Sequence, residues 1–297
     1  MSVILKDQAA ELRSLMAARQ ADPVPPPREP GHRAAHVVAI ASGKGGVGKT
    51  NIAVNLALRL SAMSHRVVLV DADLGTANVD VILNIRPAYD LSHVLNRSRA
   101  LVDVAIPINP HLRVIAGASG LAAVADLDPF DRRALVEELT RFESDCDIIL
   151  IDCSAGISQN VLAFAQAAGE MLLVITPEPT AMTDAYALVK VLSRAERTPP
   201  MGLVVNQAAT EREGRHTFER IASVAAKFLK VPLDCAGFVP RDDHVPMAVR
   251  ARIPLVERYP RCPAARGLSA LAGRVAEPLL RAETGGGFFR RVLDLFY

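Results

Sequence analysis

The stretch GKGGVGKT, residues 43–50, decides the fold. It follows an apolar run at residues 36–42 and opens a helix-length segment at residues 49–63. In such a strand–loop–helix unit, glycines let backbone N–H groups converge on phosphate oxygens, and the helix N-terminus adds partial positive charge. The spacing fulfils the pattern G-x4-G-K-[ST], in which the lysine reaches the β- and γ-phosphates and the hydroxyl binds Mg²⁺. The sequence therefore predicts a phosphate-binding loop.

Apolar runs alternate with helix-length segments on both sides of this loop. The expected strands are residues 36–42, 66–73, 112–116, 147–152, 171–176, 202–206 and 235–239, and the expected helices include residues 49–63, 131–142, 180–194 and 215–230. Continuous apolar runs separated by helices are typical of a mostly parallel sheet that helices cover on both faces. No Pro- or Gly-rich break interrupts residues 36–270, so we expect one α/β domain over residues 36–282.

Composition excludes several classes of protein. Half of the 297 residues are hydrophobic and 22% are charged, which is not the composition of a disordered chain. No run of about 18 apolar residues is present, and the N-terminus lacks a secretory h-region, so we expect a cytoplasmic protein. The net charge of +2 is too small to indicate a nucleic-acid binder by itself. The four cysteines form no CxxC, which argues against a disulfide framework or a structural zinc site.

The loop also holds an unusual pair of lysines. The chain has 28 arginines but only six lysines, and two of the six, Lys44 and Lys49, lie in the loop. KGGVGKT resembles the deviant Walker A motif of the MinD/ParA family of P-loop ATPases. The resemblance implies that Lys44 reaches across an ATP-bound homodimer to the partner's nucleotide, where it neutralises charge on the transferring phosphoryl group. It implies that ATP is held by Gly43, Gly45, Gly46, Val47, Gly48, Lys49, Thr50 and Asn51.

Two further strand ends resemble the family's catalytic segments. VVLVDADLGTANVD, residues 67–80, looks like switch I, where Asp73 would orient the attacking water and Asp71 would support the metal. IILIDCSAGI, residues 148–157, looks like the Walker B strand and switch II, where Asp152 would hold Mg²⁺ together with Thr50. Relatives read DTPAG or DTGAG where this chain reads DCSAG, and we interpret Cys153 as a small buried side chain.

The resemblance also places the adenine contacts. LVVNQ, residues 203–207, puts Asn206 at a strand end, where its amide can pair with adenine through one donor and one acceptor. FVPRDDHV, residues 238–245, resembles the loop that packs over the adenine, with Pro240 and Asp242 at the matching positions.

The N-terminus points to one branch of the family. DQAAELR, residues 7–13, looks like the DQAxxLR motif of FlhG, the regulator of flagellar number and placement, and residues 176–190 and 74–85 also read like FlhG. The resemblance implies an activator peptide at residues 1–20 that stimulates an FlhF-type GTPase through Asp7, Gln8, Leu12 and Arg13. Five prolines at residues 21–33 predict an extended tether through residue 35. Flagellar C-ring components are further candidate partners.

The C-terminus forms a second separate segment. Three glycines at residues 285–287 precede FFRRVLDLFY, in which helical spacing puts the side chains Phe288, Phe289, Val292, Leu293 and Phe296, with Leu295, on one face. Arg290, Arg291 and Asp294 lie opposite. A short helix of this kind suits an anionic membrane surface, which would make the ATP-bound protein peripheral on the inner face of the cell membrane. The alternative is a terminal helix that docks on its own domain.

Four hypotheses for the function follow from these features. An ATP-switched spatial regulator of flagella fits the most features, and a MinD-like septum-site regulator is its near alternative. A ParA-like DNA-partitioning ATPase would need a basic surface patch, and the tail suits lipid better, so we do not expect DNA as a partner. An iron–sulfur carrier is disfavoured because no cysteine pair has ligand spacing. A scaffold that hydrolyses nothing is disfavoured by Lys44 and Asp73.

Overall fold

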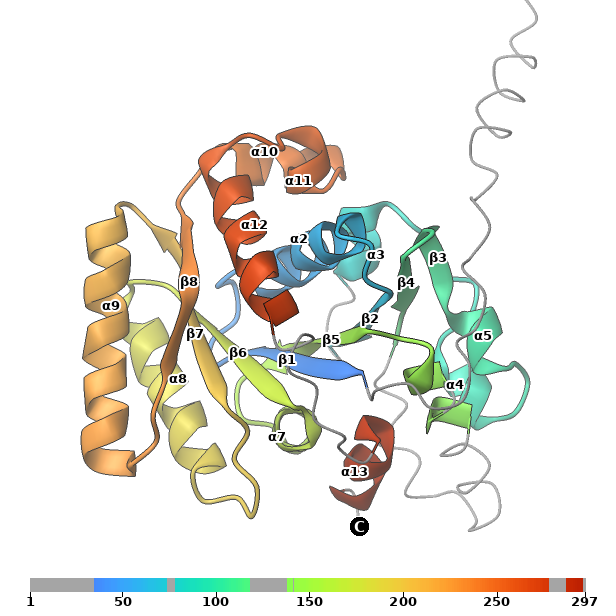
Figure 1. The fold of residues 1–297 in the computed structure, drawn as a ribbon, viewed down its shortest axis with the longest axis horizontal. Coiled ribbons are helices and arrows are strands. Elements are labelled where there is room, and N and C mark those ends of the chain that lie inside the picture. Colours follow the sequence, from blue (N-terminus) through green and yellow to red (C-terminus); the bar gives the residue numbers. More distant parts are fainter. Residues whose placement is uncertain (1–34, 74–77, 118–137, 141, 278–286, 296–297) are drawn as a thin grey trace, which may run out of the picture.

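The computed structural model describes residues 35–73, 78–117, 138–140, 142–277 and 287–295. Its frame is one sheet in the order β3-β4-β2-β5-β1-β6-β7-β8 (Figure 1). The strands are β1 (His36–Ser42), β2 (Val67–Ala72), β3 (Ile106–Asn109), β4 (Leu112–Ile115), β5 (Ile148–Ala155), β6 (Glu170–Ile175), β7 (Met201–Ala208) and β8 (Asp234–Pro240). All neighbouring pairs are parallel except β3 with β4. The expected single α/β domain with a mostly parallel sheet is confirmed.

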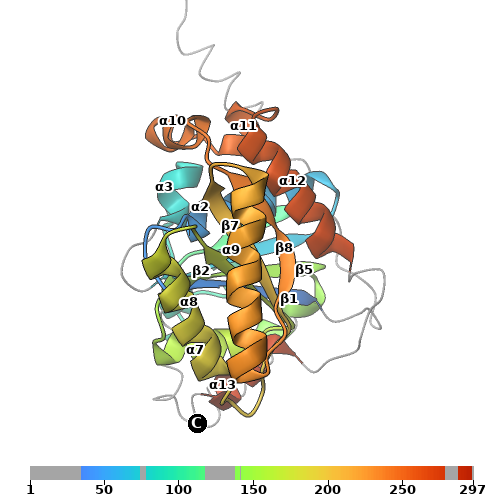
Figure 2. The same ribbon diagram turned by 90° about the vertical axis from the view of Figure 1, so that its left-hand side faces the viewer.

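Helices cover both faces of this sheet. They are α2 (Lys49–Ala62), α3 (Val79–Leu83), α4 (Leu91–Leu95), α5 (Leu101–Val104), α7 (Gln159–Ala167), α8 (Pro179–Leu192), α9 (Glu211–Val224), α10 (His244–Ala251), α11 (Leu255–Arg258), α12 (Pro263–Ala276) and α13 (Phe288–Leu295). A π-helical turn, Ala225–Leu229, continues α9. Helices α2 and α12 lie on one face, and α7 and α8 lie on the other (Figures 1 and 2). The two faces carry separate hydrophobic clusters, so the central strands are apolar on both sides.

The expected strands all form, with ends that shift by a few residues. The strand that the sequence did not predict is β3, a four-residue antiparallel edge strand that contains Pro107. A proline cannot donate to a ladder and is tolerated at a sheet edge, so β3 carries little sequence signal. The expected helix at residues 131–142 lies mostly outside the described residues, as do the N-terminal peptide and its tether. In the described part of the chain, no helix combines the length and apolar character that a membrane crossing requires.

The C-terminal helix α13 packs against α7 (Figure 1). Phe288, Phe289 and Val292 are buried in the cluster on the α7 side of the sheet, and the two phenyl rings meet edge to face with centroids 5.1 Å apart. The Phe288 N–H donates to Glu143 Oε1 at 3.0 Å, and Arg291 Nε donates to the Ala167 carbonyl at 2.9 Å. In this conformation the apolar face is therefore docked on its own domain, the alternative that the sequence left open. The Leu293 side chain and Phe296 lie outside the described part.

Candidate functional site

The phosphate loop joins β1 to α2, and its glycines are required by the backbone and by close packing. Gly46 and Gly48 have φ of 78° and 92°, in the left-handed region that disfavours side chains. A Cβ on Gly43 would collide with the Asp184 backbone in α8, and one on Gly48 would collide with the Asn206 amide. No side chain caps α2 at Gly48, so the N–H groups of its first turn can bind an anion.

Asn206, at the end of β7, holds this loop in place. Its Nδ2 donates to the Val47 carbonyl at 2.8 Å, and its Oδ1 accepts from the Gln207 N–H at 3.0 Å. A carboxamide has two N–H donors and two acceptor lone pairs, so one of each remains for a ligand. The adenine contact stays a prediction, and the structure adds a positioning role for Asn206 that the sequence did not predict.

Two buried carboxylates lie side by side next to the loop. Asp71 on β2 and Asp152 on β5 are partners in the parallel register, because the carboxyl ends of both strands reach the same edge. Burial, with a smaller contribution from the neighbouring carboxylate of Asp73, raises the pKa of Asp71 to about 6 and the pKa of Asp152 to about 7. The Thr50 hydroxyl and the Lys49 ammonium act in the opposite direction on Asp152.

The surroundings of Asp152 fit a divalent cation. Both of its carboxylate oxygens are buried. The Thr50 hydroxyl is close enough to lower the pKa, but in the part of the chain that the structure describes no well-aligned hydrogen bond reaches either oxygen. Buried polar atoms are almost always satisfied, and a divalent cation would satisfy these oxygens and remove the repulsion between the two carboxylates. Asp152, Asp71 and Thr50 are therefore the residues that would hold Mg²⁺.

Asp73 follows the last residue of β2 and belongs to the same group of side chains. Its N–H donates to Asp71 Oδ1 at 3.1 Å, which ties the start of the predicted switch I to the metal-binding side. Residues 74–77 lie outside the described ranges, so the course of the rest of this loop is not described.

Lys44 contacts its own chain. Its Nζ lies 2.9 Å from Glu178 Oε2 and donates to Thr180 Oγ1 at 3.0 Å. Both partners lie at the start of α8, which follows β6 at the edge where the loop lies. The pairing is solvent-exposed, with the Lys44 side chain 39% accessible and that of Glu178 64% accessible. An exposed ion pair contributes only about 0–1 kcal/mol, so little holds Lys44 in this position.

The predicted switch II follows Asp152 directly. The Ser154 hydroxyl donates to the Ala72 carbonyl at 3.2 Å, and the Gly156 N–H donates to the Ser42 carbonyl at 2.9 Å, so β5 stays joined to β2 and β1 as it enters the loop. Cys153 is fully buried, and burial raises the pKa of its thiol. The interpretation of Cys153 as a small buried side chain is confirmed, and such a thiol is unsuited to redox chemistry.

The loop after β8 is held by Asp242. Its Oδ2 accepts from the Ala264 N–H at 3.0 Å and its Oδ1 from the His244 N–H at 3.0 Å. Burial acts to raise the pKa of Asp242, but these hydrogen bonds outweigh it and hold the pKa at about 2. Asp242 thus ties the Pro240 loop to α10 and α12, and any adenine contact by this loop depends on that anchor.

Comparison with known proteins agrees with this geometry. The family model for the CobQ/CobB/MinD/ParA nucleotide-binding domain matches residues 38–255. The chain belongs to this family.

Its relatives include an antiactivator and a flagellum site-determining protein. It is similar to the antiactivator FleN of Pseudomonas aeruginosa, with 39% identity over 80% of this chain and 85% of that protein. It is also similar to the flagellum site-determining protein YlxH of Helicobacter pylori, with 33% identity over 86% and 89%. Among solved structures, the septum site-determining protein MinD of Pyrococcus horikoshii, complexed with Mg-ADP, matches with a TM-score of 0.62 and 25% identity over 81% of this chain and 96% of that one.

Membership in the CobQ/CobB/MinD/ParA family makes the phosphate loop a nucleotide site. Around it the structure gathers Lys44, Lys49, Thr50, Asp71, Asp73, Asp152 and Asn206 from four strand ends. Sequence reasoning missed Glu178 and Thr180 as partners of Lys44. The signal was present in TPEPT, a polar turn after a buried strand, but nothing local indicates that this turn meets residue 44. The partner-binding residues Asp7, Gln8, Leu12 and Arg13 lie outside the described residues.

Proposed function

We propose that the protein is an ATP-switched regulator of flagellar number and placement, a slow ATPase whose ATP-bound form is a homodimer. The observation that carries this proposal is Lys44, a second lysine in the phosphate loop, whose exposed ammonium is held by Glu178 and Thr180 of its own chain. Lys49 would bind the β- and γ-phosphates, while Thr50 and Asp152 would hold Mg²⁺ with support from Asp71. The bound ion would supply positive charge against the phosphates, and Asp73 would orient the attacking water.

Lys44 completes the partner's site in this proposal. Its Nζ leaves Glu178 and Thr180 and approaches the transferring phosphoryl group of the partner's nucleotide, where a cation stabilises the developing charge. The weak, exposed pairing on α8 favours this step because leaving it costs little. Hydrolysis then depends on dimer formation and on the release of Lys44 from its own chain.

The flagellar assignment rests on relatives and on the N-terminal motif. YlxH is a flagellum site-determining protein and FleN is an antiactivator, and DQAAELR, which resembles the FlhG motif, precedes a proline-rich segment in this chain. Residues 1–20 stimulate an FlhF-type GTPase through Gln8, and C-ring components are further partners. A MinD-like role in septum placement is the alternative that the same fold allows.

In this proposal the C-terminal helix couples the nucleotide state to membrane binding. Helix α13 is docked in the single chain, and in the proposal the ATP dimer releases it onto the anionic inner face of the cell membrane. Phe288, Phe289 and Val292 then exchange burial against α7 for burial among lipids, so their apolar surface stays covered. A dimer presents two tails, and the second insertion gains avidity of about 10²–10⁴ because it is intramolecular.

A phosphate-release assay tests the enzymatic part. The rate per chain should rise with protein concentration, because the site needs two chains. Lys44→Ala should bind nucleotide and release no phosphate, whereas Lys190→Ala, which removes an exposed lysine from the far end of α8, should behave as wild type. Full activity of Lys44→Ala would reject the assignment of Lys44.

A pull-down tests the flagellar part separately. The full chain should retain an FlhF-type GTPase, and a chain that lacks residues 1–20 should not. Equal retention of both chains would reject the activator peptide and leave the ATPase proposal untouched.

A further inference from the structure

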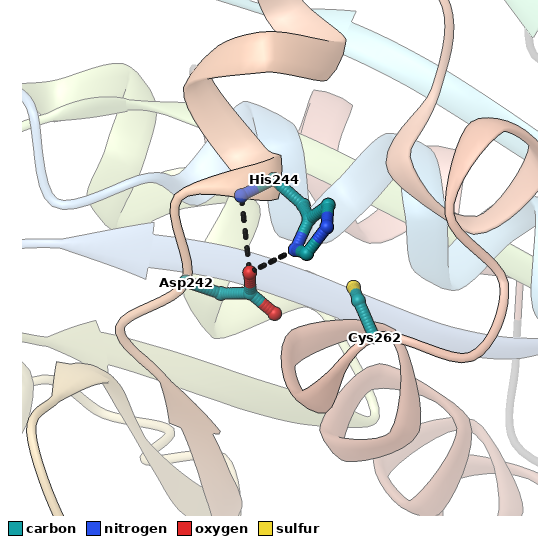
Figure 3. Close-up of side chains that lie close together, drawn as sticks. All are labelled: Asp242, His244 and Cys262. Atoms are coloured by element: carbon teal, nitrogen blue, oxygen red, sulfur yellow. Dashed lines mark hydrogen bonds and ion pairs between the residues drawn. The ribbon is translucent and has the colours of Figure 1, made fainter.

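Three metal-ligating side chains of different kinds converge beside the start of α12. They are Asp242 from the loop after β8, His244 from the first residue of α10 and Cys262 from the residue before α12 (Figure 3). One ligand atom from each lies within 4.8 Å of the others. His244 and Cys262 do not form a short motif such as CxxC, so the sequence alone does not indicate this cluster.

Hydrogen bonds fix the positions of the ligand atoms. Asp242 Oδ1 lies 2.7 Å from His244 Nδ1, and the other oxygen is held by the Ala264 N–H. Cys262 Sγ accepts from the Ala265 N–H at 3.4 Å and also hydrogen-bonds to Asp242. The imidazole ring packs on Tyr259, with ring centroids 4.6 Å apart. The carboxylate therefore gathers the thiol and the imidazole around itself.

Two other roles for this cluster, helix capping alone and nucleophilic catalysis, do not account for all three side chains. Capping accounts for the backbone bonds of Asp242 and Cys262, but serine is a better N-cap than cysteine, and capping gives the imidazole no role. A nucleophilic cysteine needs a neighbour that favours its thiolate. Here burial raises the pKa of the Cys262 thiol, and the Asp242 carboxylate raises it further. A cation between the three side chains would reverse this effect, because it stabilises the thiolate and the carboxylate together.

We propose that Asp242, His244 and Cys262 form a binding site for a thiophilic divalent cation, for which Zn²⁺ is the best chemical match. Sulfur, nitrogen and carboxylate oxygen are the ligands of zinc, and three protein ligands leave a fourth position for water. Donor atoms around tetrahedral zinc lie about 3.3–3.8 Å apart, so the three side chains need to shift by about 1 Å. The thiolate and the carboxylate balance the charge of the ion.

Binding changes protonation in a defined way. The Cys262 thiol loses its proton to solvent, and a neutral imidazole moves its N–H from Nδ1 to Nε2 so that Nδ1 faces the ion. The Cys262 side is buried and the His244 side chain is 45% exposed, so the fourth position opens toward solvent.

The site is separate from the nucleotide metal site and has a structural consequence. Its residues differ from Thr50, Asp71 and Asp152, and it needs no nucleotide. A bound ion would join the Pro240 loop, α10 and α12 through a third linkage besides the two backbone hydrogen bonds of Asp242. Zinc should therefore raise the melting temperature of the protein.

Competition against a chromophoric zinc chelator tests the proposal, with untagged full-length protein and no nucleotide. Wild type should bind one equivalent of Zn²⁺. Cys262→Ser, which keeps the helix cap, and His244→Ala, at a half-exposed position, should each weaken binding by more than about tenfold. Cys235→Ser is the matched control because Cys235 is an exposed cysteine that does not belong to the cluster, and it should bind as wild type.

Two further readouts guard against misfolded variants. Co²⁺ should give a thiolate-to-cobalt charge-transfer band in wild type and Cys235→Ser but not in Cys262→Ser. Zinc should raise the melting temperature of wild type and not that of His244→Ala. Equal zinc affinity of wild type, Cys262→Ser and His244→Ala, or a cobalt band that survives in Cys262→Ser, would overturn the proposal.

Discussion

The paired carboxylates Asp71 and Asp152 give the nucleotide site its own pH dependence. Both folded-state pKa values, about 6 and about 7, lie above the ordinary value of 3.8, mainly because the groups are buried. For an acid whose pKa is raised on folding, ionisation costs stability as pH rises from the unfolded value to the folded one. The nucleotide-free protein should therefore lose stability between about pH 4 and pH 7 through these groups, whereas binding of Mg²⁺ should strengthen over the same range.

Thermal unfolding of Asp152→Asn measures this cost. At about pH 8 the nucleotide-free variant should melt above wild type, by about 2–4 °C for each kcal/mol of ionisation cost that the substitution removes, and the difference should shrink as the pH falls and approach zero at about pH 4, near the unfolded pKa. Asp234→Asn, at the exposed start of β8, should show no such trend. A difference that is the same at both pH values would contradict the raised pKa.

Single residues also show where sequence reasoning stops. The loop glycines, Lys49 and Asp152 were predictable because each belongs to a local pattern of strand end, loop and helix start. The ion pair of Lys44 with Glu178 joins residues 134 positions apart, and the hydrogen bond from Asn206 to the Val47 carbonyl joins residues 159 positions apart. Such contacts depend on the order of strands in the sheet, and no local pattern encodes that order.

At the scale of elements, α13 carries the clearest prediction. Phe289 is buried against the domain and Arg290 is exposed on the opposite face. Full burial of a phenyl side chain contributes about 1.5–3 kcal/mol, so Phe289→Glu should undock the tail, while Arg290→Glu should leave it docked. Limited proteolysis without nucleotide should remove the tail faster from Phe289→Glu than from wild type or Arg290→Glu. Equal cleavage of all three would contradict the docked helix.

Sedimentation with anionic liposomes tests the release of the same helix. Wild type should sediment with ATP and stay in solution with ADP. Phe289→Glu should lose binding because its apolar face carries a charge, and Arg290→Glu should bind more weakly because one basic residue near anionic lipid contributes about 1 kcal/mol. Equal sedimentation in ATP and ADP would reject the switch, and unchanged sedimentation of a chain truncated after Gly287 would reject the tail as the anchor.

The elements also differ in how much the sequence reveals. Strand β1 was predicted to the residue because it is buried on both faces and ends at the phosphate loop. The amphipathic face of α13 was also predictable, since helical spacing fixes which side chains lie together. Its contact with α7 was not, because an apolar face fits a protein surface and a lipid surface equally well.

The N-terminal segment should act independently of the domain. A synthetic peptide of residues 1–20 should raise GTP hydrolysis by an FlhF-type GTPase, because the proline tether separates this segment from the ATPase. Gln8→Ala should abolish stimulation and leave ATP hydrolysis by the full chain unchanged, and Gln20→Ala is the matched control outside the motif. Stimulation by Gln8→Ala at the wild-type level would show that the motif assignment is wrong.

At the scale of the whole molecule, the account rests on one equilibrium between single chains and an ATP-bound pair. Lys44 held on α8 and α13 docked on α7 describe the single chain, and both would be released in the pair. Asp73 lies at the start of the predicted switch I, next to Asp71. Because its proposed role is to orient the attacking water, its removal should stop hydrolysis without preventing nucleotide binding.

Light scattering with saturating Mg·ATP measures this equilibrium most directly. Asp73→Ala should have the mass of a dimer with ATP and of a single chain with ADP, and wild type should form the dimer only until its ATP is consumed. A single-chain mass for Asp73→Ala with bound ATP would contradict the account.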